Sequence, residues 1–228
     1  MEIRFLGHSC FELTEGDTRV LIDPFLTGNP KAAVEASELN PTHIFLTHGH
    51  SDHYGDIVDI AKRTGAQVVA IVEIAGELGE AGVENLSDPN LGGTVEFGGG
   101  LRVRLVPAWH TSTTPNGTVN TPAGIVIGLG GKVVYHLGDT CLFSDLRLVG
   151  ERTPVDLALM CIGGHYTMDR EDAAVAAELV GAATVIPCHY NTFPPIETDV
   201  QAFKADVEQR TGGRTTVEVL EPGATYSL

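Results

Sequence analysis

The feature that most constrains this chain is a cluster of metal-binding side chains between residues 47 and 53. The segment reads Thr-His-Gly-His-Ser-Asp-His, so the groups on His48, His50, Asp52 and His53 fall within six residues. Imidazole and carboxylate groups are ligands for zinc and other divalent first-row metals. A solvated histidine-rich loop is the competing interpretation, but a strand that reads as buried directly precedes the cluster. We therefore expect a metal site here.

The segments on either side of the cluster predict its place in the fold. Residues 43–47 are apolar and rich in strand formers, whereas residues 54–64 carry apolar side chains at helical spacing. The cluster is thus expected on a loop between a strand and a helix. His48 and His50 are two residues apart, so an extended backbone points both imidazoles to the same side. Asp52 is then favoured by the partial positive charge at the start of the helix.

Composition narrows the class of protein. The chain has 228 residues and a formal net charge of −16, so it can form a substantial core, and its acidic surface repels nucleic acid. The four cysteines show neither a C-x-x-C pair nor a disulfide framework, which predicts reduced, mostly buried thiols. The sequence shows no signal peptide and no membrane span. We expect a cytoplasmic protein that acts on a small molecule and binds neither nucleic acid nor membrane, with a homo-oligomer as an open alternative.

Short apolar strands alternate with turns and helices along the chain. Three strands within residues 3–22 suggest an antiparallel meander. Residues 92–100 read as turns, and residues 101–107 alternate apolar and basic side chains, as in a half-exposed strand. Residues 169–180 and 199–210 have the caps and the apolar spacing of helices.

The second half of the sequence resembles the first in the order of these elements. We expect a single domain over residues 1–228, formed by two related halves at about 1–115 and 116–228. Two mixed β-sheets packed face to face, with helices outside, would bury the apolar strands. The expected class is therefore α/β (α+β).

Three further candidate ligands, His110, Asp139 and His189, each lie directly after an apolar strand. Any one of them alone would more often be an ordinary polar residue, but strand ends on one edge of a sandwich converge in space. A single zinc takes about four ligands, whereas these three residues and the four of the cluster make seven candidate ligands. The full set suits two metals about 3.5–4 Å apart. We expect two divalent metal ions, zinc first, with manganese, nickel and iron as alternatives.

The order of these motifs resembles the metallo-β-lactamase superfamily. An H-x-H-x-D-H motif follows Thr47, then come one His, one Asp and one His, and an Asp follows an early strand, so the resemblance covers essentially the whole chain. It implies a four-layer αβ/βα sandwich of two mixed β-sheets with outer helices. It also implies that Asp23 fixes the metal loop through hydrogen bonds. The implied ligands are His48, His50 and His110 for one metal, Asp52, His53 and His189 for the other, and Asp139 as the bridge.

Two further stretches are similar to one subgroup of that superfamily. They are Leu-Gly-His-Ser-Cys-Phe at residues 6–11 and Ile-Gly-Gly-His-Tyr-Thr-Met at residues 162–168. The subgroup contains small cytoplasmic metal-dependent hydrolases related to the L-ascorbate-6-phosphate lactonases. It often has Asn where this chain has His165, which leaves the role of His165 open. His165, Tyr166 and Tyr190 are each candidates to donate a hydrogen bond to the substrate.

The expected chemistry is hydrolysis by a metal-bridging hydroxide, because a bound metal lowers the pKa of water to about 7. The hydroxide would attack a small ester, lactone or phosphoester, while Asp52 orients it and carries the proton onward. Thr47 and His8 are candidates for substrate contacts or for support behind the ligands. A histidine satisfied by local backbone is an equal interpretation of His8. Trp109 is expected to pack in the core or under the site.

Two other functions stay open at this point. One is a member of the same fold that binds a metal or a ligand without turnover, since ligands alone do not establish chemistry. The other is a mononuclear iron oxygenase, which needs about three protein ligands and fits the larger set less well.

Overall fold

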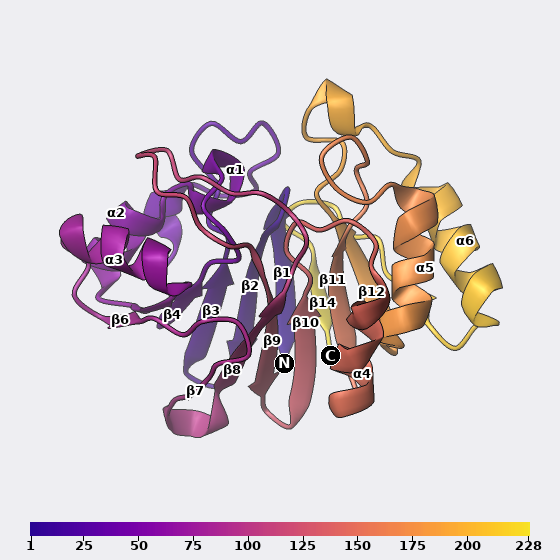
Figure 1. The fold of residues 1–228 in the computed structure, drawn as a ribbon, viewed down its shortest axis with the longest axis horizontal. Helices are drawn as coiled ribbons and strands as arrows, with labels where there is room; N and C mark the ends of the chain where they lie inside the picture. Colours follow the sequence, from indigo (N-terminus) through magenta and orange to yellow (C-terminus); the bar gives the residue numbers. More distant parts are fainter.

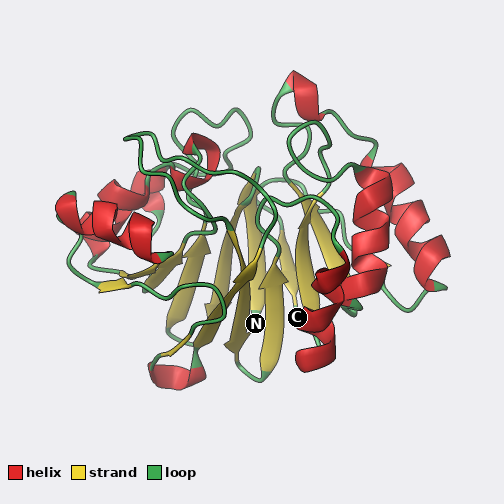
Figure 2. Ribbon diagram, viewed as in Figure 1, coloured by secondary structure: helices red, strands yellow, loops and turns green.

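The computed structural model describes residues 1–228 and contains two seven-stranded β-sheets packed face to face, with helices on the outer faces (Figures 1 and 2). Helices α2 and α3 cover the first sheet, and α4, α5 and α6 cover the second (Figure 1). This is the α/β sandwich of two mixed sheets that the sequence predicted. No helix has the length and apolar character that a bilayer crossing requires.

The first sheet has the strand order β14-β1-β2-β3-β4-β5-β6. Its first three strands pair antiparallel and form the expected meander, whereas β3 to β6 pair in parallel. The last strand of the chain returns and pairs antiparallel with β1, so the two termini lie side by side (Figure 1). The strands are β1 Glu2–Gly7, β2 Cys10–Glu15, β3 Thr18–Ile22, β4 His43–Phe45, β5 Gln67–Val69, β6 Leu86–Ser87 and β14 Thr225–Ser227.

The second sheet repeats this plan in the order β13-β12-β11-β10-β9-β8-β7. Strands β7 to β10 pair antiparallel, and β10 to β13 pair in parallel. The strands are β7 Thr94–Glu96, β8 Arg102–Pro107, β9 Ala123–Leu129, β10 Lys132–His136, β11 Leu157–Cys161, β12 Thr184–Cys188 and β13 Thr216–Val217.

Six α-helices and four short 3₁₀ turns connect the strands. Asp169 caps α5 and Asp199 caps α6 by accepting hydrogen bonds from backbone amides in the first turn of each helix. The helices are α1 Ser51–Tyr54, α2 Ile57–Thr64, α3 Val72–Glu80, α4 Arg147–Arg152, α5 Arg170–Val180 and α6 Val200–Thr211, and the 3₁₀ turns are Ala36–Glu38, Gly98–Gly100, Ser144–Leu146 and Pro194–Ile196.

The apolar side chains divide into two clusters that match the layers. The larger cluster holds 38 buried residues and fills the space between the sheets and under α2 and α3. The smaller cluster holds 22 buried residues and lies between the outer face of the second sheet and α4 to α6. Neighbouring residues of one strand belong to different clusters, as Ile125 and Val126 do in β9, because successive side chains of a strand point to opposite faces.

The structure differs from several local expectations. The first sheet takes β1 to β6 and the returning β14, and the second sheet begins at Thr94, whereas the halves that we expected to meet at about 115 stay a prediction. Residues 92–100 are not only turns, because β7 forms there as a short edge strand. Helices α3 and α4 and strands β6 and β14 were not predicted, because each is short and its position depends on distant neighbours. The extent of the domain stays a prediction.

Two side chains are more exposed than the sequence suggested. Trp109 is 65% exposed instead of packed in the core or under the site. Cys141 is exposed, whereas Cys10, Cys161 and Cys188 are buried free thiols as expected. Arg104 differs in the opposite sense. It lies in a strand expected to be half-exposed, yet it is only 8% exposed.

The turn between β1 and β2 depends on Gly7, which has a φ of 111°. A Cβ atom at this position would overlap the carbonyl oxygen of Lys31. The register of the two strands shifts at Gly7, and His8 follows it with a φ of 58° at the edge of the sandwich where the polar strand ends meet. The glycine therefore sets where the His8 imidazole lies.

We expect Gly7→Ala to lower the free energy of unfolding by about 3 kcal/mol or more, because it adds an overlap to a strained backbone conformation. Gly16→Ala is the matched control, since Gly16 also has a positive φ but has open space around it, and its cost should be about 1–2 kcal/mol. Urea unfolding of both variants measures the difference. Equal losses would show that the contact with Lys31 is unimportant.

Candidate metal centre

The loop after β4 presents its imidazoles with defined ring orientations. His50 occupies the N-cap position of the single-turn helix α1 without a capping hydrogen bond from its side chain, and Asp52 lies in the first turn of that helix. The Nε2 atom of His48 lies 3.2 Å from Nδ1 of His50, so the two rings converge as the spacing predicted. The cluster thus lies between a strand and a helix, although the expected helix is interrupted at Gly55.

Asp23 holds this loop from behind. It is fully buried and has a φ of 45° directly after β3. Its carboxylate accepts hydrogen bonds from the Thr47 amide at 2.8 Å, the Thr47 hydroxyl at 2.6 Å and His53 Nδ1 at 2.7 Å. The Thr47 oxygen in turn accepts from His48 Nδ1 at 3.0 Å, because its own proton goes to Asp23. As a result, His48 and His53 both direct Nε2 away from Asp23 and toward the centre of the cluster.

Three residues from distant parts of the sequence meet this loop. The Oδ2 atom of Asp139, after β10, lies 3.1 Å from His189 Nε2 and 3.6 Å from His110 Nε2. Its Oδ1 atom lies 3.3 Å from His53 Nε2. Asp139 is therefore the side chain that touches the most members of the set. All seven residues that the sequence selected as ligands are brought together.

The possible ligand atoms form three overlapping groups, each within 4.8 Å. One group is His48, His50 and His110. A second contains His8, Asp52, His53 and His189, and a third joins His48 and His53 to Asp139. The first two groups match the two ligand sets that the family resemblance implied, with His8 added to the second. Asp139 lies where the two sets meet.

Several buried atoms at the centre have no hydrogen-bond partner, which tests whether the set fits a cation. These atoms are His53 Nε2, Asp139 Oδ1 and both ring nitrogens of His189. Buried polar atoms nearly always have a partner, so a group of buried polar atoms without one is costly unless something binds them. Nitrogen and carboxylate donors that face one another in this way fit divalent metal ions. Their role as ligands stays a prediction.

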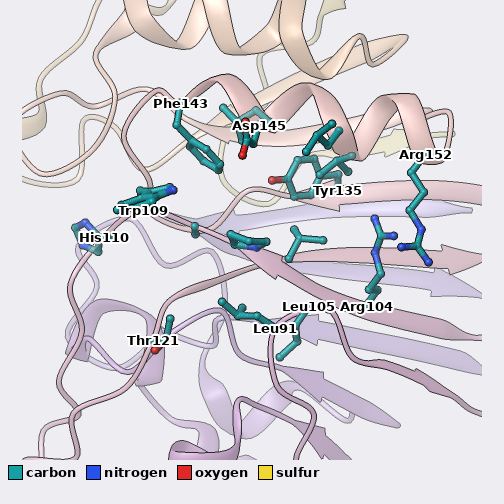
Figure 3. Close-up of a pocket in the computed structure, with 17 residues that line it drawn as sticks. Leu91, Arg104, Leu105, Trp109, His110, Thr121, Tyr135, Phe143, Asp145 and Arg152 are labelled. Carbon is teal, nitrogen blue, oxygen red and sulfur yellow. The ribbon is translucent and has the colours of Figure 1, made fainter.

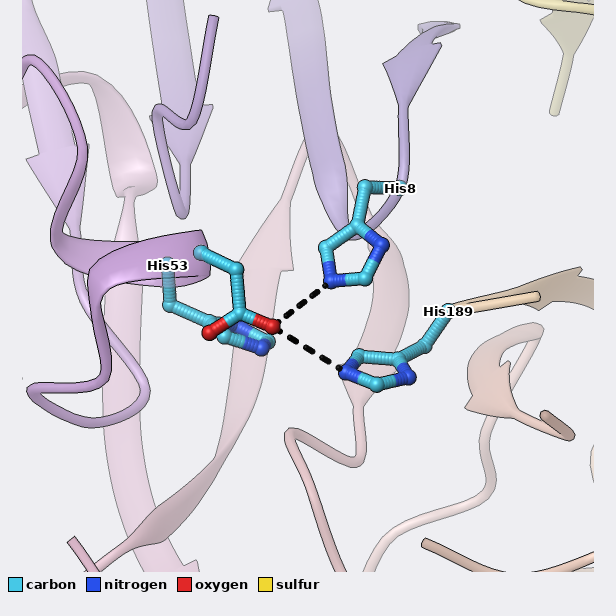
Figure 4. A group of neighbouring side chains, drawn as sticks. His8, His53 and His189 are labelled. Carbon is cyan, nitrogen blue, oxygen red and sulfur yellow. Dashed lines mark hydrogen bonds and ion pairs between the residues drawn. The ribbon is translucent and has the colours of Figure 1, made fainter. Parts of the chain in front are cut away.

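His8 belongs to the same network, and the sequence left open whether it supports the site or is satisfied by local backbone. Its imidazole is buried, with Nδ1 at 2.8 Å from the Thr192 hydroxyl and Nε2 at 3.1 Å from Asp52 Oδ2. Figure 4 shows His8 and His189 reaching the same carboxylate oxygen of Asp52 from two sides. Burial, followed by repulsion from His189, lowers the pKa of His8 to about 4, so the ring is neutral. A neutral ring donates through Nε2 to Asp52 and accepts from Thr192.

Charges inside the cluster favour bound cations. Burial raises the pKa of Asp139 and Asp52, but contacts with His189 and other imidazoles outweigh it and hold the pKa of both carboxyl groups well below the usual range. Burial likewise opposes protonation of His189, yet Asp139 and Asp52 raise the pKa of His189 to about 9. Two carboxylates thus stay ionised among histidines, and this negative charge attracts metal ions.

A cavity of about 640 Å³ opens directly onto the cluster. Asp52 and His110 line it together with aromatic residues and threonines, and it contains no lysine or arginine. Its walls are Phe25, His50, Ser51, Asp52, His110, Thr111, Thr113, Thr114, Pro115, Asp139, Tyr166, His189, Phe193 and Pro195.

The remaining candidates lie in different places. His165 is exposed, has a φ of 47° and packs edge-on against Tyr166, but only Tyr166 lines the cavity. Tyr190 lines a separate cavity behind His8. Sequence reasoning missed Thr192, which orients His8, and Ser112, whose oxygen accepts from the Gly49 amide at 2.8 Å. Both are ordinary loop residues, and no local pattern distinguishes them.

Comparison with known proteins agrees with this geometry. Residues 18–190 match the family described as the beta-lactamase superfamily domain. The UPF0173 metal-dependent hydrolase of Thermus thermophilus is 52% identical over 229 residues, covering 100% of this chain and 99% of that protein. One from Methanopyrus kandleri is 47% identical over 230 residues, with 99% of each chain covered. The solved structure of Igni18, a metallo hydrolase from Ignicoccus hospitalis, covers 100% of this chain and 98% of its own, with 37% identity and a TM-score of 0.89.

We expect Asp23→Asn to weaken metal binding by roughly 10–100-fold, because in either amide orientation an NH₂ group faces a donor on Thr47 or His53. Isothermal titration of the metal-free protein measures the affinity. Asp156→Asn is the matched control, because Asp156 also accepts a backbone hydrogen bond, from Val133 at 2.8 Å, but lies outside the metal cluster. The same loss of affinity in both variants would contradict the positioning role of Asp23.

Proposed function

Because this chain belongs to the beta-lactamase superfamily, as one of its UPF0173 metal-dependent hydrolases, we propose that it hydrolyses a small neutral ester or lactone with two divalent cations, zinc first. The observation that carries the proposal is the convergence of five imidazoles and two carboxylates, Asp139 among them, beside an open cavity. The cavity of about 640 Å³ has the size of a small-molecule site. The proposed partner is a small-molecule substrate, and neither nucleic acid nor a membrane is a proposed partner.

In this proposal, the clustered side chains hold two cations, with three ligands for each and one ligand shared. His48, His50 and His110 would hold the first, and His53, His189 and Asp52 the second. Asp139 contacts members of both sets, which supports its role as the shared ligand. A mononuclear iron oxygenase would need only about three of these groups, so the size of the set favours two metals. When bound, the cations would supply Lewis-acid polarisation of a substrate oxygen and of water.

Asp52 is the residue best placed to handle the proton of the attacking water. Its side chain is 28% exposed and lines the cavity, whereas Asp139 is almost fully buried. Its Oδ2 atom receives the hydrogen bond from His8, so His8 fixes the carboxylate without itself contacting the cavity. We assign Asp52 as the catalytic base and His8 as a positioning residue.

The lining of the cavity favours an uncharged substrate. It contains aromatic rings, prolines and threonine hydroxyls but no lysine or arginine to pair with a phosphate group. Within the ester, lactone and phosphoester classes expected from the sequence, a neutral ester or lactone therefore fits best. The hydroxyl of Tyr166, at the mouth of the cavity, is the candidate donor to the substrate oxygen.

Elemental analysis combined with a substrate panel tests the proposal. We expect two metal equivalents per chain and turnover of neutral aryl esters or lactones at least tenfold above that of an aryl phosphodiester. A chelator should abolish this activity, and added metal should restore it. One metal per chain would overturn the two-metal site, and full metal content without turnover of any ester or lactone would overturn the hydrolytic function.

Two substitutions separate metal binding from proton transfer. Asp139→Ala removes the carboxylate shared by both sets, so metal content and activity should fall together. Asp52→Asn keeps an oxygen ligand but loses the base, so kcat should fall by about 10²-fold or more while metal content falls less. Metal content and kcat are measured on the same samples. Two retained metals with normal turnover in either variant would refute the role given to that residue.

A further inference from the structure

A second cavity, of about 620 Å³, lies on the outer face of the second sheet, beneath α4. Figure 3 shows its floor along β8 and β10 and its roof on the segment that leads into α4. It meets the metal cavity only at His110, which lines both. Most of its wall is apolar, including Val106, Tyr135, Phe143, Leu146, Leu148 and Val149.

One end of this cavity carries two arginines without acidic partners. Arg104 is only 8% exposed, yet it makes no salt bridge and no side-chain hydrogen bond, and Arg152 on α4 likewise has no ion-pair partner. Figure 3 shows their guanidinium groups close together at the end far from His110. Burial, and then the proximity of Arg152 and Arg102, lowers the pKa of Arg104, which reflects this crowding of positive charge. An enclosed cation without a counter-ion is costly. The chain has 30 acidic residues, yet none of them pairs with this arginine.

Two further polar groups line the cavity. The hydroxyl of Tyr135 is buried and has no hydrogen-bond partner, so it is free to bind an oxygen atom of a ligand. Asp145 lies nearer Phe143 than the arginines in Figure 3 and accepts a hydrogen bond from the Ser144 hydroxyl at 2.9 Å. The only carboxylate in the wall therefore does not neutralise the arginine pair.

We propose that this cavity binds an amphiphilic anion, a molecule with an elongated apolar body and one terminal carboxylate or phosphate group. The anionic group pairs with Arg104 and Arg152, and the body lies along β8 toward Trp109. From Arg104 to His110 an extended chain spans about 20 Å, which accommodates a medium-length alkyl chain. A second copy of this protein is a poorer occupant, because each copy carries a net charge of −16.

Trp109 provides a direct test because it is the single tryptophan of the chain, is 65% exposed and lines the cavity. Metal-replete protein is titrated with dodecanoate, dodecyl phosphate and dodecanol below their micelle concentrations, and the fluorescence of Trp109 is followed. We expect a saturable blue shift with at least one of the two anions and at least tenfold weaker binding of the uncharged alcohol. The two anions distinguish a carboxylate ligand from a phosphate ligand.

Charge-removing variants locate the anion. Arg152→Met and Arg104→Met should each raise the Kd of the preferred anion at least fivefold and leave dodecanol binding unchanged. Arg147→Met is the matched control, since Arg147 begins the same helix but does not line the cavity, and it should bind as the unmodified protein does. Arg152 is exposed, so its variant does not threaten the fold.

Three outcomes would overturn the proposal. If dodecanol bound as tightly as the anions, the cavity would have no anion site. If Arg147→Met and Arg152→Met weakened anion binding equally, the effect would come from the overall charge of the protein. The third combines no saturable signal with a dimer in sedimentation that Leu148→Glu dissociates. That result would show a second copy covering the cavity, because Leu148 is 52% exposed at its rim.

Discussion

The buried carboxylate of Asp139 is the group on which the rest of the site depends. It lies within 4 Å of a ring nitrogen of His48, His53, His110 and His189, which come from three separate segments of the chain. Such a concentration of ionisable groups is unfavourable in an apolar interior unless the charges compensate one another. The two sheets have to meet at this edge for the carboxylate and the imidazoles to be in contact, so the site forms only when both sheets are folded and packed together.

The surrounding backbone is built to hold these groups at some cost. His8, Asp23 and His189 all have positive φ, a conformation that residues other than glycine rarely adopt. Each directly follows a strand or its terminal glycine, so the chain turns sharply and points its side chain at the cluster. The hydrogen bonds that Asp23 accepts from Thr47 and His53, and the one that His8 donates to Asp52, offset part of this strain and fix the ring orientations. The geometry of the His/Asp cluster is thus prepared in part by residues outside the seven candidate ligands.

The two cavities differ in place and in chemistry. The cavity at the edge of the sandwich, where the loops after the strands meet, has acidic and imidazole groups and neither lysine nor arginine. On the outer side, the cavity under α4 is apolar and ends in two arginines. The segment that carries Trp109 and His110 separates them, with His110 shared by both walls. A ligand in the outer cavity would therefore contact the same segment that supplies one imidazole to the His/Asp cluster.

Local signals were enough to predict the sandwich of mixed sheets and to select the candidate ligands after apolar strands, because strand alternation and a dense His/Asp motif can be read along the chain. The sequence by itself did not determine the boundary between the sheets, the pairing of β14 with β1, the exposure of Trp109 or the burial of Arg104. It also left open whether His8 touches substrate or Asp52, and it gave no sign of Thr192. These features depend on which distant segments pack together, and only the tertiary structure decides that, because burial and hydrogen-bond partners are properties of neighbours in space.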